Sequence, residues 1–220
     1  MPQGDRYIPM PDALFKTLGT REVDRFLAGF HDIADDHRSA YAGRLKHLTR
    51  GGFPPGVTVG PGVAVRYDAD MLFQMLVVTE LWQHGVSPAR AMALVTEAWP
   101  RMRGDVLRVW LSVEASNRDG KPAENYVDPL YWRVPVEALR HMARPDRPYS
   151  PDAEDRIDTL TKEQAHAELD ARGYSLRGSS FIKVDQLIRD ALRQLGDTVL
   201  THPEVSSFMH AMIPLPKVEV

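Results

Sequence analysis

Residues 51–62, Gly-Gly-Phe-Pro-Pro-Gly-Val-Thr-Val-Gly-Pro-Gly, hold five glycines and three prolines and cannot form a helix. The first two glycines are suited to end a helix that precedes them. Valines alternate on both sides of the Gly60-Pro61-Gly62 turn, which predicts a short hairpin over residues 57–67. This segment therefore separates helices before it from helices after it.

Two helices are predicted before this segment. Apolar residues recur at helical intervals up to Phe30 in residues 13–30, where we expect a break at Gly19 and Thr20 as the N-cap of the second piece. A further helix over residues 37–50 would follow Asp36 as its N-cap. It would bury one face, made of Tyr41, Leu45 and Leu48.

Further elements are predicted after the hairpin. Asp68 is placed to cap a helix ending near Gly85, and Ser87-Pro88 to begin another that ends near Trp99-Pro100. The patterns over residues 106–113 and 131–136 predict strands. Those over residues 161–172 and 181–195 predict helices, the first with Thr161 and Gln164 in capping-box spacing. We expect the tail from Pro214 to be loose.

The order of these elements predicts an α+β, mainly α fold. We expect a winged helix-turn-helix domain over residues 1–104 and a strand-rich segment over residues 105–143. A linker over residues 144–155 and a helical C-terminal region over residues 156–220 follow. The C-terminal region is a candidate for dimerisation, since two-fold DNA sites call for two-fold proteins. The helix over residues 181–195 either forms the dimer interface or packs within its own chain.

Charge is unevenly distributed. The 220 residues contain 27 Lys and Arg and 30 Asp and Glu, a formal net charge of −3. That balance argues against a protein that coats nucleic acid by bulk positive charge. Residues 37–66 nevertheless contain no Asp or Glu, and their basic side chains are Arg38, Arg44, Lys46, Arg50 and Arg66, with His37 and His47. This acid-free window coincides with the predicted second helix and hairpin.

Four motifs within residues 37–95 resemble the DNA-binding domain of the MerR family of transcription regulators. The turn Gly52-Phe53-Pro54-Pro55 follows a basic helix, and Gly62-Val63-Ala64-Val65-Arg66-Tyr67 matches the wing edge. Tyr67-Asp68-Ala69-Asp70 begins the next helix, and Gly85-Val86-Ser87 follows at the spacing found in that family. Arg44-Leu45-Lys46-His47 stands where the family has Arg-Tyr-Tyr/Trp-Glu.

The resemblance implies a divergent, sequence-specific DNA-binding transcription regulator. Its partners would be double-stranded DNA, a second copy of the chain in a homodimer, and RNA polymerase. The second helix would enter the major groove and the wing would lie over neighbouring phosphates. The candidate DNA-binding residues are Arg38, Ser39, Arg44, Lys46, His47, Arg50, Arg66 and Tyr67. For the basic helix residues the alternative is a solvated helix face, and for Tyr67 it is packing beneath the hairpin.

The sequence leaves other functions open. The principal alternative is a winged helix that binds a protein and no DNA. A DNA-packaging subunit of the small-terminase type is a further alternative that the sequence does not exclude. His31 and Asp35 lie one helical turn apart but lack a third convergent ligand, and Gly178-Ser179-Ser180 lacks the pattern of a nucleophile. We therefore expect no enzyme, no metal and no cofactor.

Composition limits the location as well. The chain has no cysteine, which excludes disulfides and thiolate metal sites. No apolar run is long enough for a membrane-spanning helix, and no signal peptide is visible. We expect a cytoplasmic protein with no membrane contact.

Overall fold

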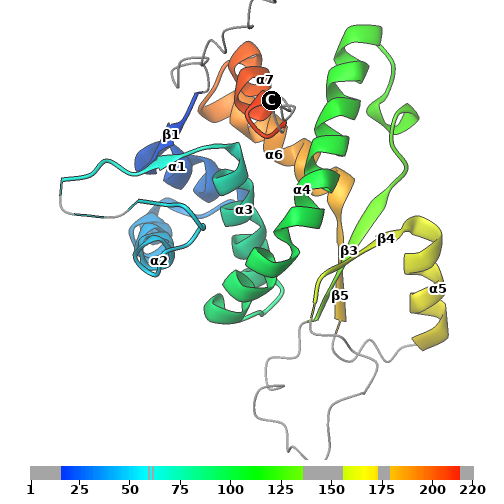
Figure 1. Ribbon diagram of the computed structural model, residues 1–220, viewed down its shortest axis with the longest axis horizontal. Coiled ribbons are helices and arrows are strands. Elements are labelled where there is room, and N and C mark those ends of the chain that lie inside the picture. Colours follow the sequence, from blue (N-terminus) through cyan, green and yellow to red (C-terminus); the bar gives the residue numbers. More distant parts are fainter. Residues whose placement is uncertain (1–15, 59, 61, 136–155, 173–178, 214–220) are drawn as a thin grey trace, which may run out of the picture.

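The computed structural model describes residues 16–58, 60, 62–135, 156–172 and 179–213. Within these ranges the chain is mainly helical with two small sheets, which confirms the α+β, mainly α expectation (Figure 1). In chain order the elements are β1 (Leu18–Gly19), α1 (Thr20–Phe30), the 3-10 turn η2 (Asp35–His37), α2 (Arg38–Arg50), β2 (Arg66–Tyr67), α3 (Ala69–Gln83), α4 (Pro88–Asp119), η3 (Ala123–Asn125), β3 (Leu130–Pro135), β4 (Asp158–Thr161), α5 (Lys162–Arg172), β5 (Ser179–Lys183), α6 (Val184–Thr198) and α7 (His202–His210). None of the helices in the described part of the chain could cross a membrane.

The first helix begins at Thr20, so its N-cap lies one residue earlier than predicted. Gly19 is the N-cap, and its backbone N–H donates to Glu22 Oε2 at 2.7 Å. Residues 18–19 form β1 instead of the expected helix, whereas residues 13–15 lie outside the described ranges. The predicted apolar stripe is confirmed, because Val23, Phe26 and Leu27 are buried.

Helix α2 confirms the predicted basic helix but not its cap. Asp36 lies in η2, and His37 occupies the N-cap position with no capping bond from its side chain. Tyr41, Leu45 and Leu48 are buried, as predicted, and Gly51 follows the last turn.

The predicted hairpin is not formed by the described residues of the 57–67 segment. A turn is present, since Val63 N–H donates to Gly60 O at 3.2 Å. The only strand in this described segment is β2, and its partner is β1 near the start of the chain, with Leu18 opposite Tyr67. Pairing with a strand ahead of α1 replaces pairing within the hairpin.

The two helices that follow begin as predicted, but the second is much longer. Asp68 accepts a hydrogen bond from Met71 N at 2.8 Å, and Ser87 with Pro88 begins α4. Helix α4 continues through Pro100, so the predicted strand over residues 106–113 is wrong and the expected boundary at residue 104 lies inside a helix. Burial follows the helical period there: Val106, Val109 and Trp110 are buried, whereas Leu111 is exposed.

The second sheet has the antiparallel order β4-β3-β5. Its central strand confirms the prediction over residues 131–136 and places Trp132 opposite Ile182. The Trp132 indole N–H donates to Asp105 Oδ2 of α4 at 2.9 Å, which fixes the sheet to that helix. Figure 1 shows this sheet and α5 on one side of the molecule and α2 on the other.

The helical C-terminal region differs from the prediction at one boundary. Residues 181–183 belong to β5, so α6 begins only at Val184. Its apolar side packs against α1 and α4 inside the chain, which supports the second reading of residues 181–195 and not the dimer interface. The core is continuous from Leu18 to Met212.

Two capping boxes begin the remaining helices. Thr161 N–H donates to Gln164 Oε1 at 2.9 Å, as predicted for α5. The sequence analysis missed α7, although Thr201 and Glu204 have the same spacing and Thr201 N–H donates to Glu204 Oε2 at 2.8 Å. The expected linker over residues 144–155 and the tail from Pro214 lie outside the described residues.

Candidate nucleic-acid interface

Helix α2 is buried along one side only. Its core contacts come from Tyr41, Leu45, Leu48 and Thr49, and most of the remaining side chains are exposed. Figure 1 shows α2 at the edge of the molecule, beside the segment that leads to β2. Helix α2 therefore offers an accessible convex face.

Five of the predicted site residues form an exposed set that we call the basic surface. It consists of Arg44, Lys46, His47 and Arg50 of α2 and Arg66 of β2. Among the described residues, none of these five side chains has an acidic partner. Their donors are thus available to an anionic ligand.

Several cations elsewhere in the described ranges are paired with acidic side chains. Arg103 Nε lies 2.8 Å from Asp70 Oδ1, and Arg133 Nη1 lies 3.0 Å from Glu168 Oε1. Both arginines are mostly buried within the protein's own ion pairs. The basic surface differs from these pairs in both exposure and charge balance.

The first residues of α2 are less available than predicted. Arg38 Nε lies 2.9 Å from Asp35 Oδ1, so its charge is partly neutralised at the start of the helix. Both side chains are exposed, and such a surface ion pair is weak enough to exchange for another anion. Ser39 is exposed and follows directly.

Tyr67 does not belong to the basic surface. Its side chain is only 2% exposed, and its hydroxyl lies 3.0 Å from Thr49 Oγ1. A contact between this ring and DNA was therefore a wrong prediction, and the packing alternative is correct. Burial raises the pKa of the Tyr67 hydroxyl, which keeps it protonated as a hydrogen-bonding group.

A cleft of about 660 Å³ separates α1 and α2 from the 60–67 segment. Lys46 and Arg50 line it, and Asp24 of α1 is the one acidic residue in its described lining. Burial raises the pKa of the Asp24 carboxyl to about 6. The sequence analysis missed this carboxyl, because the acid-free window was counted along the chain and Asp24 reaches the cleft from another helix.

His31 connects the end of α1 to α3. Its Nε2 lies 2.8 Å from Thr79 Oγ1, and its Nδ1 lies 3.9 Å from Glu80 Oε2. Burial lowers the pKa of His31 to about 4, so the ring is neutral near pH 7. Within the described ranges, no three His, Asp or Glu side chains converge to hold a metal ion.

The structure also gives Ser180 a partner that the sequence did not indicate. Ser180 Oγ of β5 lies 2.6 Å from His84 Nδ1, and His84 Nε2 lies 3.5 Å from Glu80 Oε1. The second distance is longer than the 2.6–3.2 Å typical of a nucleophile's supporting hydrogen bonds. We interpret this series as a tie between the end of α3 and the three-stranded sheet.

Comparisons of the chain with protein-family models, curated proteins and solved structures find no match, so the roles of these side chains are inferred from their geometry.

Proposed function

We propose that this chain is a sequence-specific DNA-binding transcription regulator that holds double-stranded DNA against the basic surface. The observation that carries the proposal is the set of five exposed basic side chains on α2 and β2 that have no acidic partner among the described residues. Phosphate groups of DNA attract such side chains and release counterions when they are neutralised. A helix exposed on all but one side also fits the width of a major groove.

The arrangement fits a divergent winged helix-turn-helix of the kind found in the MerR family. Helices α1 and α2 would be the helix-turn-helix, with α2 in the major groove. The segment that ends at β2 would be the wing, although its described residues contain one short strand in place of a hairpin. Arg66 at its end would contact phosphate, and Arg44 would reach a base edge.

The first experiment finds a DNA site and then asks whether the basic surface recognises it. Genomic fragments retained by the purified chain are sequenced, and a retained duplex and a scrambled duplex are compared by fluorescence anisotropy. We expect Arg44→Ala to weaken binding to the retained duplex about tenfold or more. The matched control is Arg108→Ala on α4, an exposed arginine outside the basic surface.

Equal affinities for the Arg44→Ala, Arg66→Ala and Arg108→Ala variants on both duplexes would refute the proposal. The basic surface would then be a solvated face. A winged helix that binds a protein would become the better reading.

We further propose that the working form is a homodimer, since one recognition helix covers only a few base pairs. Light scattering at tens of micromolar should give twice the mass of the chain. A monomer under those conditions would contradict this part of the proposal and leave DNA binding itself untouched.

A further inference from the structure

A second cavity, of about 550 Å³, lies between α2 and the turn that joins α3 to α4. We call it the α2–α4 pocket. Its apolar lining includes Leu48 and Val86, which are buried, and the partly exposed indole of Trp82. Its volume lies within the range of about 300–1,000 Å³ that small-molecule sites occupy.

Among the described residues, the polar side chains that line the α2–α4 pocket have no hydrogen-bond or ion-pair partner. Arg44 and His47 line it, and no acidic residue occurs in its described lining. The Trp82 Nε1 donor is buried and has no hydrogen-bond acceptor among the described residues.

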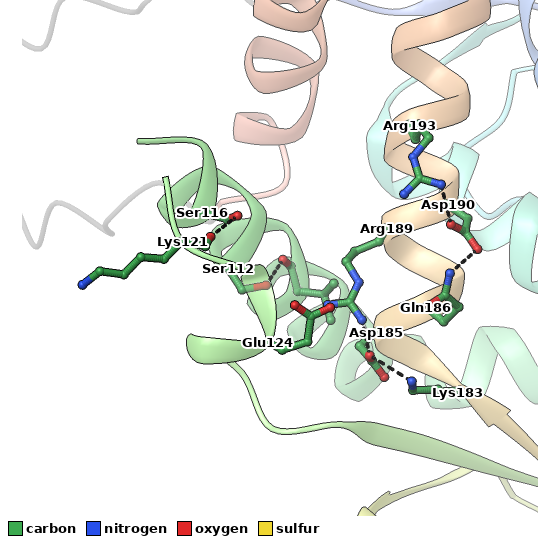
Figure 2. Close-up of polar contacts among 11 residues, drawn as sticks. Ser112, Ser116, Lys121, Glu124, Lys183, Asp185, Gln186, Arg189, Asp190 and Arg193 are labelled. Carbon is green, nitrogen blue, oxygen red and sulfur yellow. Dashed lines mark hydrogen bonds and ion pairs between the residues drawn. The ribbon is translucent and has the colours of Figure 1, made fainter. Parts of the chain in front are cut away.

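The cavity between α4, α6 and α7 provides a contrast. Its volume is about 340 Å³, and Arg189 and Arg193 line it. Figure 2 shows that both arginines are engaged: Arg189 pairs with Asp185 and Glu124, and Arg193 pairs with Asp190. Because those charges are already neutralised, the described lining of that cavity has no unpaired arginine to match Arg44 in the α2–α4 pocket.

We propose that the α2–α4 pocket binds a small amphipathic organic anion, with a flat apolar body and a carboxylate or sulfonate group. The apolar body would lie against Trp82, Leu48 and Val86, because burying those surfaces favours binding. The acid group would accept hydrogen bonds from Arg44, and these bonds would be strong because both groups carry a charge.

The consequence for DNA binding rests on the proposed function. Arg44 and His47 belong both to the basic surface and to the α2–α4 pocket. A bound anion would neutralise the guanidinium that DNA needs, so the small molecule and DNA would exclude each other. By linkage, each would lower the affinity of the chain for the other by the same factor.

The test uses a pair of fluorescent probes that differ in charge. The anionic probe is 1-anilinonaphthalene-8-sulfonate, and N-phenyl-1-naphthylamine is the same aromatic body without the sulfonate. We expect the anionic probe to bind the full chain saturably, with one site per chain. Arg44→Ala should weaken it about tenfold and leave the neutral probe unchanged.

Two further variants sharpen the result. Arg50→Ala is the matched control, because Arg50 lines the other cleft on α2 and not the α2–α4 pocket. It should retain the affinity for the anionic probe. Trp82→Phe keeps an aromatic ring against the apolar body but removes the indole, so it should reduce energy transfer from protein to probe and retain most of the affinity.

Equal losses for Arg44→Ala and Arg50→Ala, or binding that does not saturate, would overturn the α2–α4 pocket as the site. These measurements contain no DNA, so they stand if the chain proves not to bind DNA. Displacement of a labelled duplex by the anionic probe, and not by the neutral one, then tests the exclusion separately.

Discussion

The Tyr67 hydroxyl lies 3.0 Å from Oγ1 of Thr49, so the strand after the Gly/Pro-rich segment is fixed to the last turn of α2. Thr49 Oγ1 also donates to Leu45 O at 3.2 Å. Tyr67 stands opposite Leu18 in the β1–β2 pair as well. One side chain thus sets the position of α2 relative to both β1 and β2.

Removing this hydroxyl should destabilise the fold modestly. Tyr67→Phe should lower the free energy of unfolding by about 1 kcal/mol, near the low end of the cost of losing a buried hydrogen bond, because Thr49 keeps its bond to Leu45. Urea unfolding followed by circular dichroism measures this. The control is Tyr126→Phe, whose hydroxyl bonds Asp119 Oδ2 at 2.8 Å on the exposed surface, and it should leave the midpoint unchanged. Equal midpoints for all three proteins would show that the Tyr67–Thr49 bond contributes nothing.

Arg66 and Arg44 should differ in what they do to DNA affinity. Arg66→Ala should weaken binding to retained and scrambled duplexes alike and reduce the salt slope by about one, because a phosphate contact carries no sequence information. Arg44→Ala should cost about 1–3 kcal/mol on the retained duplex and less on the scrambled one. Anisotropy titrations at several salt concentrations separate the two. An unchanged salt slope for Arg66→Ala would remove Arg66 from the contact.

Asp24 should oppose both folding and DNA binding near neutral pH. Its pKa is raised to about 6 from the ordinary 3.8, so the folded state gains stability as the pH falls through 6 and loses it as the pH rises. At pH 7.5, Asp24→Asn should be more stable by about 1 kcal/mol, after allowance for the partly exposed position of the carboxyl. It should also bind both duplexes more tightly, because Lys46 and Arg50 line the same cleft.

Urea midpoints at pH 7.5 and pH 5 check the assignment. The gap between the wild type and Asp24→Asn should narrow at pH 5. Loss of stability in the variant at pH 7.5 would mean that the Asp24 carboxylate makes a favourable contact and is not opposed by burial.

His31 should make the fold sensitive to mild acid. Its pKa of about 4 in the folded state lies below the ordinary 6.5, so the unfolded chain takes up a proton first as the pH falls. Stability should decline by about 2–3 kcal/mol between pH 6.5 and pH 4 through this group alone. His31→Gln removes the contribution, and the difference between the two proteins isolates it from the nearby Glu80. Parallel pH curves for wild type and variant would contradict the prediction.

Two glycines near α2 should respond oppositely to alanine. A Cβ at Gly43 would meet no atom within 4 Å, so Gly43→Ala should stabilise the helix by about 0.5–1 kcal/mol. Gly52 has a φ of +82°, and Gly52→Ala should cost about 1–2 kcal/mol. Thermal unfolding of the two variants gives the comparison. Destabilisation by Gly43→Ala would mean that another part of the chain contacts this face of α2.

Three helix starts were predictable because their determinants are local. Asp68, Ser87-Pro88 and the Thr161–Gln164 pair all lie within one turn of the helix they begin. Each places a cap whose geometry depends on a few consecutive residues. The same rule would have found α7 from Thr201 and Glu204.

The strand predicted over residues 106–113 failed because its pattern is ambiguous. Valine, leucine and tryptophan occur at spacings that fit both a buried strand and a helix, and only packing against α3 and α6 decides. The hairpin failed for a related reason. β2 pairs with β1, which lies on the far side of α1 and α2 in the sequence.

The positive charge of the candidate site was predictable from the sequence, but the exact set of residues that form it was not. The acid-free window identified the basic surface. Tyr67 is buried in the core, Arg38 forms an ion pair with Asp35, and Asp24 of α1 lines the cleft beside α2. These three outcomes depend on which elements the fold brings together.

Helix α4 joins the part of the chain that carries the basic surface to the three-stranded sheet, so the two parts do not form separate folding units. It begins beside the α2–α4 pocket and runs for 32 residues, about 48 Å, past Asp105, which holds the sheet through Trp132. A chain cut at residue 104 would end inside this helix and would also expose the side of α1 that α6 covers. The two halves therefore depend on each other for a complete core. Recombination that transferred α2 and its surroundings to another protein would have to transfer α6 and the sheet as well.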